Sequence, residues 1–464
     1  MSTRMRSMLL ALAVAAIPAA GRAQVDATIG SLQQLPFDTV TPNPTGIKMF
    51  YYVPTSGQAP MPVVVGLHSC QGNQDQLMSW LKATADAHGF MLAIPFANRR
   101  DANVSGVTGC WDVGSDDALA RPSSSDSAGV VALVNYVGTT LRCGGEPCGD
   151  LAQVFATGQS SGAMMTNVLL GTYPELFKAG ASFMGVPFGC WAAGVGGAHP
   201  APGTADTLGD PAGWSGSCAN GSVTHTPAEW AALLPYTDAD TPPRMLIFHG
   251  ANDTLVHYTN FGEQLDQWTA IHELPLAPEA TDHPGAPAGH VWTRTRYGGT
   301  GPQPLVEAVS IAGTDHFSSM SAGVAPAIAR FFGIGDAEPP AAPTGLAAGS
   351  VTATGATLGW TAPAGGGVAN YVVSRVDGAT ATAVAWPTTA SQALTGLTAE
   401  TEYTYRVAAV DAAGNISEAA SVEFTTAAGS KPSGGGCGQG APAGAAVAIV
   451  LAALTLARRR RGRA

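Results

Sequence analysis

Two patterns of hydrophobic and polar positions divide the chain. Up to about residue 336, short apolar runs alternate with stretches of helical spacing. Met61–His68 is a continuous apolar run, Gln76–His88 has helical periodicity, and Phe90–Pro95 is the next apolar run. Continuous apolar strands are typical of a sheet covered on both faces. Beyond residue 344 the apolar positions alternate, as in Tyr403–Val410. The chain is therefore predicted to hold an α/β domain followed by an all-β domain.

Shifts in composition suggest where these parts begin and end. Arg4 and Arg6, an apolar run and a small-x-small site at Gly21-Arg22-Ala23 are typical of a secretory signal. The expected segments are a signal peptide at 1–23, the α/β domain at 24–336, a Pro-rich linker at 337–343, the all-β domain at 344–427, a Gly-rich hinge at 428–440, and an apolar segment with an arginine cluster at 441–464.

Overall charge and composition exclude some classes of function. The formal net charge is −11, so no broad basic groove is available for nucleic acid. Charged residues make up only 12 % and glycines number 58, which favours a loop-rich exported protein. Export in turn makes disulfides possible.

The chemistry is centred on Gly158-Gln159-Ser160-Ser161-Gly162. An apolar run of strand type, Val154–Thr157, precedes this motif, and a stretch of helical spacing, Ala163–Leu170, follows it. A serine on a sharp turn between strand and helix, flanked by two glycines, is the nucleophile-elbow pattern of the α/β-hydrolase fold. Ser160 is therefore the predicted nucleophile.

The acid and base of such a site follow the serine in that order along the chain. Asp253 comes just after the predicted strand Arg244–Gly250, and His316 follows the predicted strand Leu305–Ile311. Asp238 and Asp240 are rival acids that precede their strand, and Asp315 is a fallback. The other candidate bases lie in less suitable places: His257, His272, His283 and His290.

An oxyanion hole needs two backbone N–H groups directed at the developing negative charge. Ser161, which follows the nucleophile, supplies one of them in this fold. The loop His68-Ser69-Cys70-Gln71-Gly72 comes after an early strand, and its Cys70 amide is the expected second donor. His68 is interpreted as a structural histidine near the pocket rather than as a second base.

Six of the seven cysteines lie in the α/β domain. Six cysteines allow fifteen pairings. Cys143 and Cys148 enclose a short loop and are expected to pair, and Cys70–Cys110 and Cys190–Cys218 are the pairs expected among the other four cysteines. No Cys-x-x-Cys motif or His pair has the spacing of zinc ligands, so neither a metal nor a cofactor is predicted.

Several motifs resemble carbohydrate esterase family one and the related polyhydroxybutyrate depolymerases, with fungal-type acetylxylan esterases as the nearest likeness. They include Gly109–Val113, Thr157–Phe177, Gly185–Cys190, Ser217–Gly221 and His249–Asp253. The resemblance implies the triad Ser160, Asp253 and His316, with Trp111 close to the substrate pocket. Gly313-Thr314-Asp315-His316-Phe317 departs from the family's usual Gly-x-Gly-His, which leaves the substrate open.

The all-β segment resembles a fibronectin type III module. Trp360, Leu397 placed six residues before Tyr403, and the turn Asp411–Asn415 carry this likeness. The expected function is that of a secreted serine carboxylesterase that deacylates a polymer, most simply acetylated xylan. Feruloyl esterase and extracellular polyhydroxybutyrate depolymerase are alternatives within the class. A non-catalytic surface adhesion protein is the alternative from another class. The oligomeric state stays open.

The C-terminal segment resembles bacterial sorting tags of the kind found in myxobacteria. Cys437-Gly438 precedes the apolar run Ala441–Ala457, and arginines follow it directly. As a helix this run would be about 25 Å long, which is marginal for a membrane span. The arginines on its far side fit the positive-inside rule. We expect transient or permanent membrane contact here, with the enzyme at the cell surface or released.

This layout predicts processing at both ends of the chain. In its native host, the mature protein is expected to begin near Gln24 and to end near Cys437, because the arginines resist translocation while the chain is cut on the exported side. Intact-mass measurement of the purified native protein tests this. A species that still carried Arg458–Ala464 would instead indicate a retained anchor.

Overall fold

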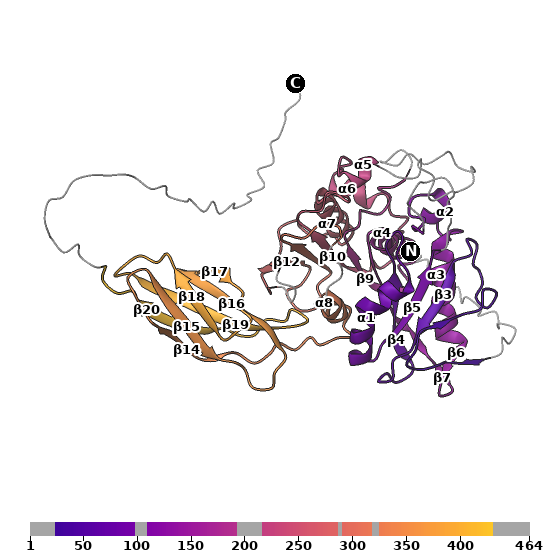
Figure 1. The fold of residues 1–464 in the computed structure, drawn as a ribbon. Helices are drawn as coiled ribbons and strands as arrows, with labels where there is room; N and C mark the ends of the chain where they lie inside the picture. Colours follow the sequence, from indigo (N-terminus) through magenta and orange to yellow (C-terminus); the bar gives the residue numbers. More distant parts are fainter. Residues whose placement is uncertain (1–23, 98–108, 193–215, 286–289, 318–323, 430–464) are drawn as a thin grey trace, which may run out of the picture.

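The structure is a computed structural model that describes residues 24–97, 109–192, 216–285, 290–317 and 324–429. Figure 1 shows a larger α/β body and a smaller all-β body, joined at the chain segment after α8. The expected signal peptide, nearly all of the Gly-rich hinge and the arginine-tailed apolar segment lie outside the described residues. Within the described residues, none of the helices has both the length and the apolar character that crossing a membrane requires.

The elements follow one another along the chain with these bounds: β1 Val25–Asp26, β2 Gln33–Gln34, β3 Lys48–Tyr52, β4 Met61–Leu67, α1 Gln74–His88, β5 Met91–Phe96, α2 Asp116–Leu119, α3 Asp126–Thr139, β6 Leu141–Cys143, β7 Glu146–Pro147, β8 Gly149–Gln159, α4 Ser161–Thr172, β9 Phe177–Phe183, α5 Gly216–Ala219, α6 Pro227–Ala231, β10 Arg244–Gly250, α7 Thr259–Ile271, β11 Ala280–Asp282, β12 Trp292–Tyr297, β13 Val306–Ile311, α8 Val324–Phe332, β14 Thr344–Gly349, β15 Gly355–Thr361, β16 Val368–Asp377, β17 Thr380–Ala385, β18 Ser391–Thr395, β19 Glu402–Asp411 and β20 Ala420–Thr425.

A ten-stranded sheet forms the centre of the α/β body, in the order β11-β12-β13-β10-β9-β8-β4-β5-β3-β2. The six strands from β13 to β5 run parallel, and the two strands at each end are added antiparallel. Because the inner strands are parallel, their carboxyl ends meet along one edge. Ligand sites in such sheets lie outside that edge.

Helices cover both faces of the sheet, which explains the continuous apolar strands. On β4, Val63 and Val65 pack into one core together with α3, α4 and α7, whereas Val64 packs into a second core with α1 and α8. The expected α/β-hydrolase domain is thus confirmed as a sheet between two helical layers.

The all-β body is a sandwich of two sheets, ordered β14-β15-β18 and β17-β16-β19-β20. Its core includes Trp360, which lies edge to face with Tyr371 at 5.1 Å between ring centroids. The Tyr403 hydroxyl accepts a hydrogen bond from the Thr398 backbone N–H at 2.9 Å, as in a tyrosine corner. The predicted class of this domain, a fibronectin type III sandwich, is confirmed.

Three side chains of the sandwich donate hydrogen bonds to backbone carbonyls of the α/β body. Trp386 Nε1 donates to His283 at 2.9 Å, Asn370 Nδ2 to Pro284 at 3.1 Å, and Asn415 Nδ2 to Asp336 at 3.0 Å. His283 and Pro284 directly follow the edge strand β11. The sandwich therefore contacts the side of the sheet that ends in β11.

An ionic network joins β11, β12, β13 and α8 on this side of the sheet. Glu307 on β13 pairs with Arg330 of α8 and, at 3.2 Å, with Arg296 of β12. Asp282 pairs with Arg294 at 2.8 Å and with Arg296 at 2.9 Å. Paired charges of this kind avoid the large cost of an isolated buried ion. The network fixes the two elements between which His316 lies.

Candidate active site

The turn that carries Ser160 is set by two close backbone approaches. A Cβ atom at position 162 would overlap the carbonyl oxygen of Leu67, and one at position 158 would lie 2.6 Å from the same oxygen. Glycine alone has no such atom. Ser160 has φ 56° and ψ −120°, an unusual conformation for a residue with a side chain. The sharp turn from β8 to α4 therefore depends on both glycines of the motif.

Ser160, His316 and Asp253 form a continuous hydrogen-bonded chain. The Ser160 hydroxyl lies 2.9 Å from His316 Nε2, and His316 Nδ1 lies 2.7 Å from Asp253 Oδ2. A carboxylate only accepts, so Nδ1 carries the proton and donates it to Asp253. His316 Nε2 is then free to accept the serine proton. The structure brings together the three residues that the sequence suggested.

Strand order explains why the acid and the histidine meet. β10 and β13 are parallel neighbours, so the loops after them emerge side by side. The Asn252 N–H donates to the Thr314 carbonyl at 2.9 Å and ties the two loops together. A Cβ at Gly250 would lie 2.6 Å from that same carbonyl oxygen, so the close contact requires glycine.

Asp253 is buried and held as a carboxylate. Its Oδ1 accepts the N–H groups of Leu255 and Val256, both at 3.0 Å. Burial by itself would raise the pKa of Asp253, but hydrogen bonds from His249 and His316 outweigh it, and the pKa lies well below its ordinary value. The carboxylate is therefore ionised and can stabilise a positive charge on His316.

Hydrogen bonds of the His68 ring hold the loop after β4 in place. The ring donates from Nδ1 to the Ser69 carbonyl at 2.8 Å, and its Nε2 accepts the Ala97 N–H at 3.0 Å. Burial lowers the pKa of His68 to about 4, so the ring is neutral. Gln71, with φ 62°, makes the turn that brings this loop back towards α1.

Trp111 connects this loop to the elbow. Its indole N–H donates to the His68 carbonyl at 2.9 Å, and its backbone N–H donates to the Ser161 hydroxyl at 2.8 Å. The disulfide Cys70–Cys110 crosses the same junction. Trp111 therefore supports both segments that carry the expected oxyanion donors, Cys70 and Ser161.

The assignment of Trp111 and His68 to the substrate pocket needs correction. Trp111 is 1 % exposed and His68 is fully buried, and neither lines the pocket beside Ser160. Their polar atoms are engaged by the backbone of the loops around them, so they face inward. Both residues support the loop after β4, and Trp111 also supports Ser161, without facing the pocket.

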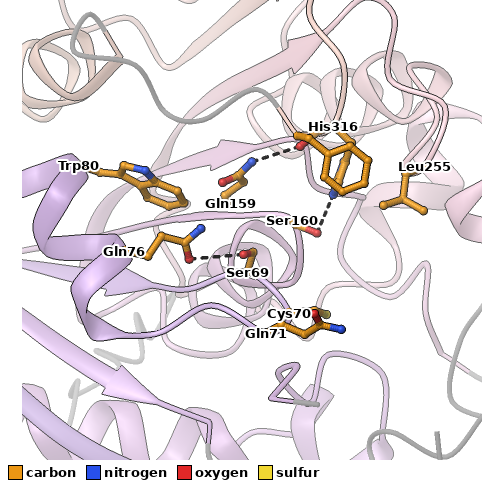
Figure 2. A pocket seen from close by; sticks show the side chains of 10 residues that line it. Ser69, Cys70, Gln71, Gln76, Trp80, Gln159, Ser160, Leu255 and His316 are labelled. Carbon is orange, nitrogen blue, oxygen red and sulfur yellow. Dashed lines mark hydrogen bonds between the residues drawn. The ribbon is translucent and has the colours of Figure 1, made fainter. Parts of the chain in front are cut away.

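A pocket of about 600 Å³ opens at Ser160. Figure 2 shows Trp80 and Gln76 on one side of Ser160, and His316 and Leu255 on the other. Phe317 also lines the pocket and is 80 % exposed. Sequence reasoning missed Trp80, Gln76, Leu255 and Phe317 as pocket residues. Among these four residues, only Phe317 could have been suggested from the sequence, because it directly follows His316.

Several of the rival candidates have partners other than the triad residues. Asp240 pairs with Arg121 at 2.8 Å, and the Asp315 carboxylate accepts the Phe317 N–H at 3.0 Å. Among the other histidines, His257 contacts Thr259, His272 contacts the Pro243 carbonyl, and the His283 ring lies edge-on against Trp386. The disulfides in the structure match the expected pairs: Cys70–Cys110, Cys143–Cys148 and Cys190–Cys218.

This arrangement is suited to acyl transfer. A serine hydroxyl in contact with an oriented neutral imidazole can be deprotonated as it attacks a carbonyl carbon. The N-terminus of α4 lies at the serine and favours negative charge there. Fold and site together define a serine carboxylic ester hydrolase of the α/β-hydrolase class.

Comparison with known proteins places the chain more closely. The family model for esterase PHB depolymerase matches residues 47–200, and that for the fibronectin type III domain matches residues 341–425. A model for the prolyl oligopeptidase family matches residues 145–267. The last match covers the elbow and the acid, which are shared features of the wider fold.

The relatives are fungal esterases. Feruloyl esterase B of Talaromyces stipitatus is 34 % identical over 63 % of this chain and 73 % of its own length. Feruloyl esterase B of Thermothelomyces thermophilus is 38 % identical over 55 % of this chain and 79 % of its own length. The acetylxylan esterase of Coprinopsis cinerea is 34 % identical over 59 % of this chain and 66 % of its own length. The solved acetyl xylan esterase from Aspergillus awamori is 28 % identical, with a TM-score of 0.53, and covers 66 % of this chain and 100 % of that one. The chain belongs to the esterase family that contains these feruloyl and acetylxylan esterases.

The Cys70–Cys110 crosslink generates a prediction. Replacing both residues with serine opens a loop that the disulfide closes over a sequence separation of 40. Because the unfolded chain then gains conformational entropy, we expect the free energy of unfolding to fall by roughly 3–4 kcal/mol. We also expect lower kcat, because Cys70 lies in the loop expected to supply an oxyanion donor. Chemical denaturation and ester hydrolysis measure the two effects.

The matched control is the double serine variant of Cys143 and Cys148. This disulfide closes a short loop, with a sequence separation of 5, and neither cysteine lines the pocket. The control variant should lose some stability and retain kcat. Equal loss of kcat in both variants would contradict a specific role of Cys70–Cys110 in the site.

Proposed function

We propose that this protein is an exported esterase that removes acyl groups from a polysaccharide, with acetylated xylan as its first substrate. The hydrogen-bonded chain from Ser160 through His316 to Asp253 carries the proposal, because Ser160 and His316 line a pocket. The printed functions of the fungal relatives supply the substrate class. Export rests on the signal-like sequence at residues 1–23.

In this proposal Ser160 attacks the ester carbonyl while His316 accepts its proton at Nε2. The backbone N–H groups of Ser161 and Cys70 bind the resulting oxyanion. The protonated His316, stabilised by Asp253, then donates its proton to the sugar oxygen as the bond from this oxygen to the acyl carbon breaks, so that the sugar leaves as an alcohol. Water repeats these steps on the acyl-enzyme and releases the acid.

Pocket size and lining bear on the substrate. An acetyl group would fill only a small part of about 600 Å³, so the pocket has room for part of the sugar chain as well. The same observation supports a second candidate: Trp80, Leu255 and Phe317 could contact the ring of a feruloyl group. Polyhydroxybutyrate, named in the matching family model, is a third substrate to test.

The nucleophile is tested by Ser160→Ala. We expect the fold to persist and hydrolysis of 4-nitrophenyl acetate to fall by at least about a thousandfold, because no group remains to form the acyl-enzyme. Ser222→Ala, at an exposed serine, is the matched control and should retain full activity. A Ser160→Ala variant with more than about a tenth of wild-type activity would contradict the proposed triad. A wild-type protein with no activity would favour the adhesion alternative.

The substrate is tested by parallel assays on acetylxylan, methyl ferulate and polyhydroxybutyrate, each with Ser160→Ala as the blank. We expect the highest kcat/KM on acetylxylan. Phe317→Ala should raise KM for the polymer, because the exposed ring lies at the pocket mouth, whereas Phe37→Ala, an exposed ring that does not line the pocket, should leave KM unchanged. A kcat/KM on methyl ferulate well above that on acetylxylan would contradict the proposed substrate and favour a feruloyl esterase.

A further inference from the structure

A second histidine lies behind the acid and has no role in the steps above. His249 is on β10, the strand that leads into the Asp253 loop, and its side chain is fully buried. Its ring meets Tyr258 and Phe261 edge to face, at centroid distances of 5.8 and 6.4 Å. A buried, titratable ring in this position needs an account of its hydrogen bonds.

The contacts of His249 define its protonation. Its Nε2 lies 2.8 Å from the Val256 carbonyl oxygen and 3.3 Å from Asp253 Oδ2. Both atoms only accept, so Nε2 carries a proton and donates to them. Nδ1 is buried and has no hydrogen-bond partner among the described residues. A proton on Nδ1 would be an unpaired buried donor, so the neutral ring carries its proton on Nε2.

This places two imidazoles on one carboxylate oxygen. Asp253 Oδ2 receives His316 Nδ1 at 2.7 Å and His249 Nε2 at 3.3 Å, while Oδ1 receives the N–H groups of Leu255 and Val256. The His249 N–H spans the turn from Asp253 to Val256, because it contacts the carboxylate at one end and the carbonyl at the other. Rotation of the carboxylate away from His316 would therefore break this contact as well.

We propose that His249 is a positioning residue, whose Nε2–H, shared between Val256 and Asp253, fixes the carboxylate in the orientation that His316 needs. The proposal rests on the proposed function in taking His316 as the general base and Asp253 as its partner. His249 touches neither Ser160 nor the pocket, so it acts through Asp253 alone.

Removing this donor should have a defined electrostatic effect. Without this donor the carboxylate can turn away from His316, and a carboxylate in that orientation stabilises protonated His316 less. The acid limb of the pH profile of kcat/KM then moves to lower pH. The titratable groups facing the His249 ring are Asp253 and Tyr258, whose hydroxyl donates to Ser310 at 2.7 Å. Phe261 of α7 adds only an apolar ring.

Three variants separate positioning from packing. In His249→Gln the amide nitrogen is as many bonds from Cβ as Nε2 and can donate to the same acceptors. In His249→Asn it falls short, and His249→Phe keeps the ring without a donor. We expect kcat on 4-nitrophenyl acetate to fall about tenfold in the Phe and Asn variants, with the acid limb moved to lower pH, and to recover to within about threefold in His249→Gln.

Rates are counted per site titrated with a serine-directed phosphonate, so that misfolded protein does not enter. A Phe variant with wild-type kcat and an unmoved acid limb would overturn the proposal, as would equal kcat in the Gln and Asn variants. These assays also separate the two proposals. If Ser160→Ala is inactive while the His249 variants behave as wild type, only the inference about His249 fails.

A measurement on the wild-type protein does not depend on any variant folding. With ¹⁵N-labelled histidine, the two ring nitrogens of His249 in the neutral ring should report the Nε2–H tautomer, because Nε2 faces an acceptor and Nδ1 does not. A neutral ring protonated at Nδ1 would overturn the proposal.

Discussion

The active site depends on one steric contact, the approach of the α4 N-terminus to the end of β4. Gly158 and Gly162 both lie against the Leu67 carbonyl oxygen, where no Cβ can fit. This contact makes the turn at Ser160 sharp and brings the loop after β4 beside Ser161. The nucleophile and the two segments that carry the expected oxyanion donors are thus consequences of one packing requirement. Trp111 and the Cys70–Cys110 disulfide then hold the two segments together.

A second requirement, the adjacency of β10 and β13, governs the acid and the base. The Asn252–Thr314 hydrogen bond and the absence of a side chain at Gly250 let the two loops touch. The Asp253 carboxylate lies where the loops meet and accepts N–H groups from its own turn, from His316 and from His249. The end of β13 thereby defines the position of His316, and the end of the neighbouring strand β10 defines the position of Asp253. The ionic network around Glu307 holds β13 against α8 beneath them.

The sequence was informative where chemistry follows chain order and uninformative where it follows packing. Ser160, Asp253 and His316 could be suggested because each comes at the end of a recognisable apolar strand. The polar residue at the end of β4, His68, was assigned to the pocket, but its burial and hydrogen bonds direct it inward. Trp80 faces the pocket because α1 begins at Gln74, directly after the turn at Gln71, and periodicity alone does not reveal that orientation. The antiparallel strands at the sheet edges, such as β2 and β11, are too short to produce a clear pattern.

The position of the fibronectin type III sandwich follows from the same sheet. Its hydrogen bonds reach His283 and Pro284, just after the edge strand β11, and Asp336, just after α8. An exposed edge strand offers unpaired backbone groups to other chains, and a docked domain limits that access. Gly414 lies so close to Arg294 that a Cβ would be 3.2 Å from its guanidinium, so the sandwich also packs against the ionic network. None of the residues named in these contacts lines the pocket at Ser160. The sandwich can therefore hold the esterase in a fixed orientation without covering its pocket.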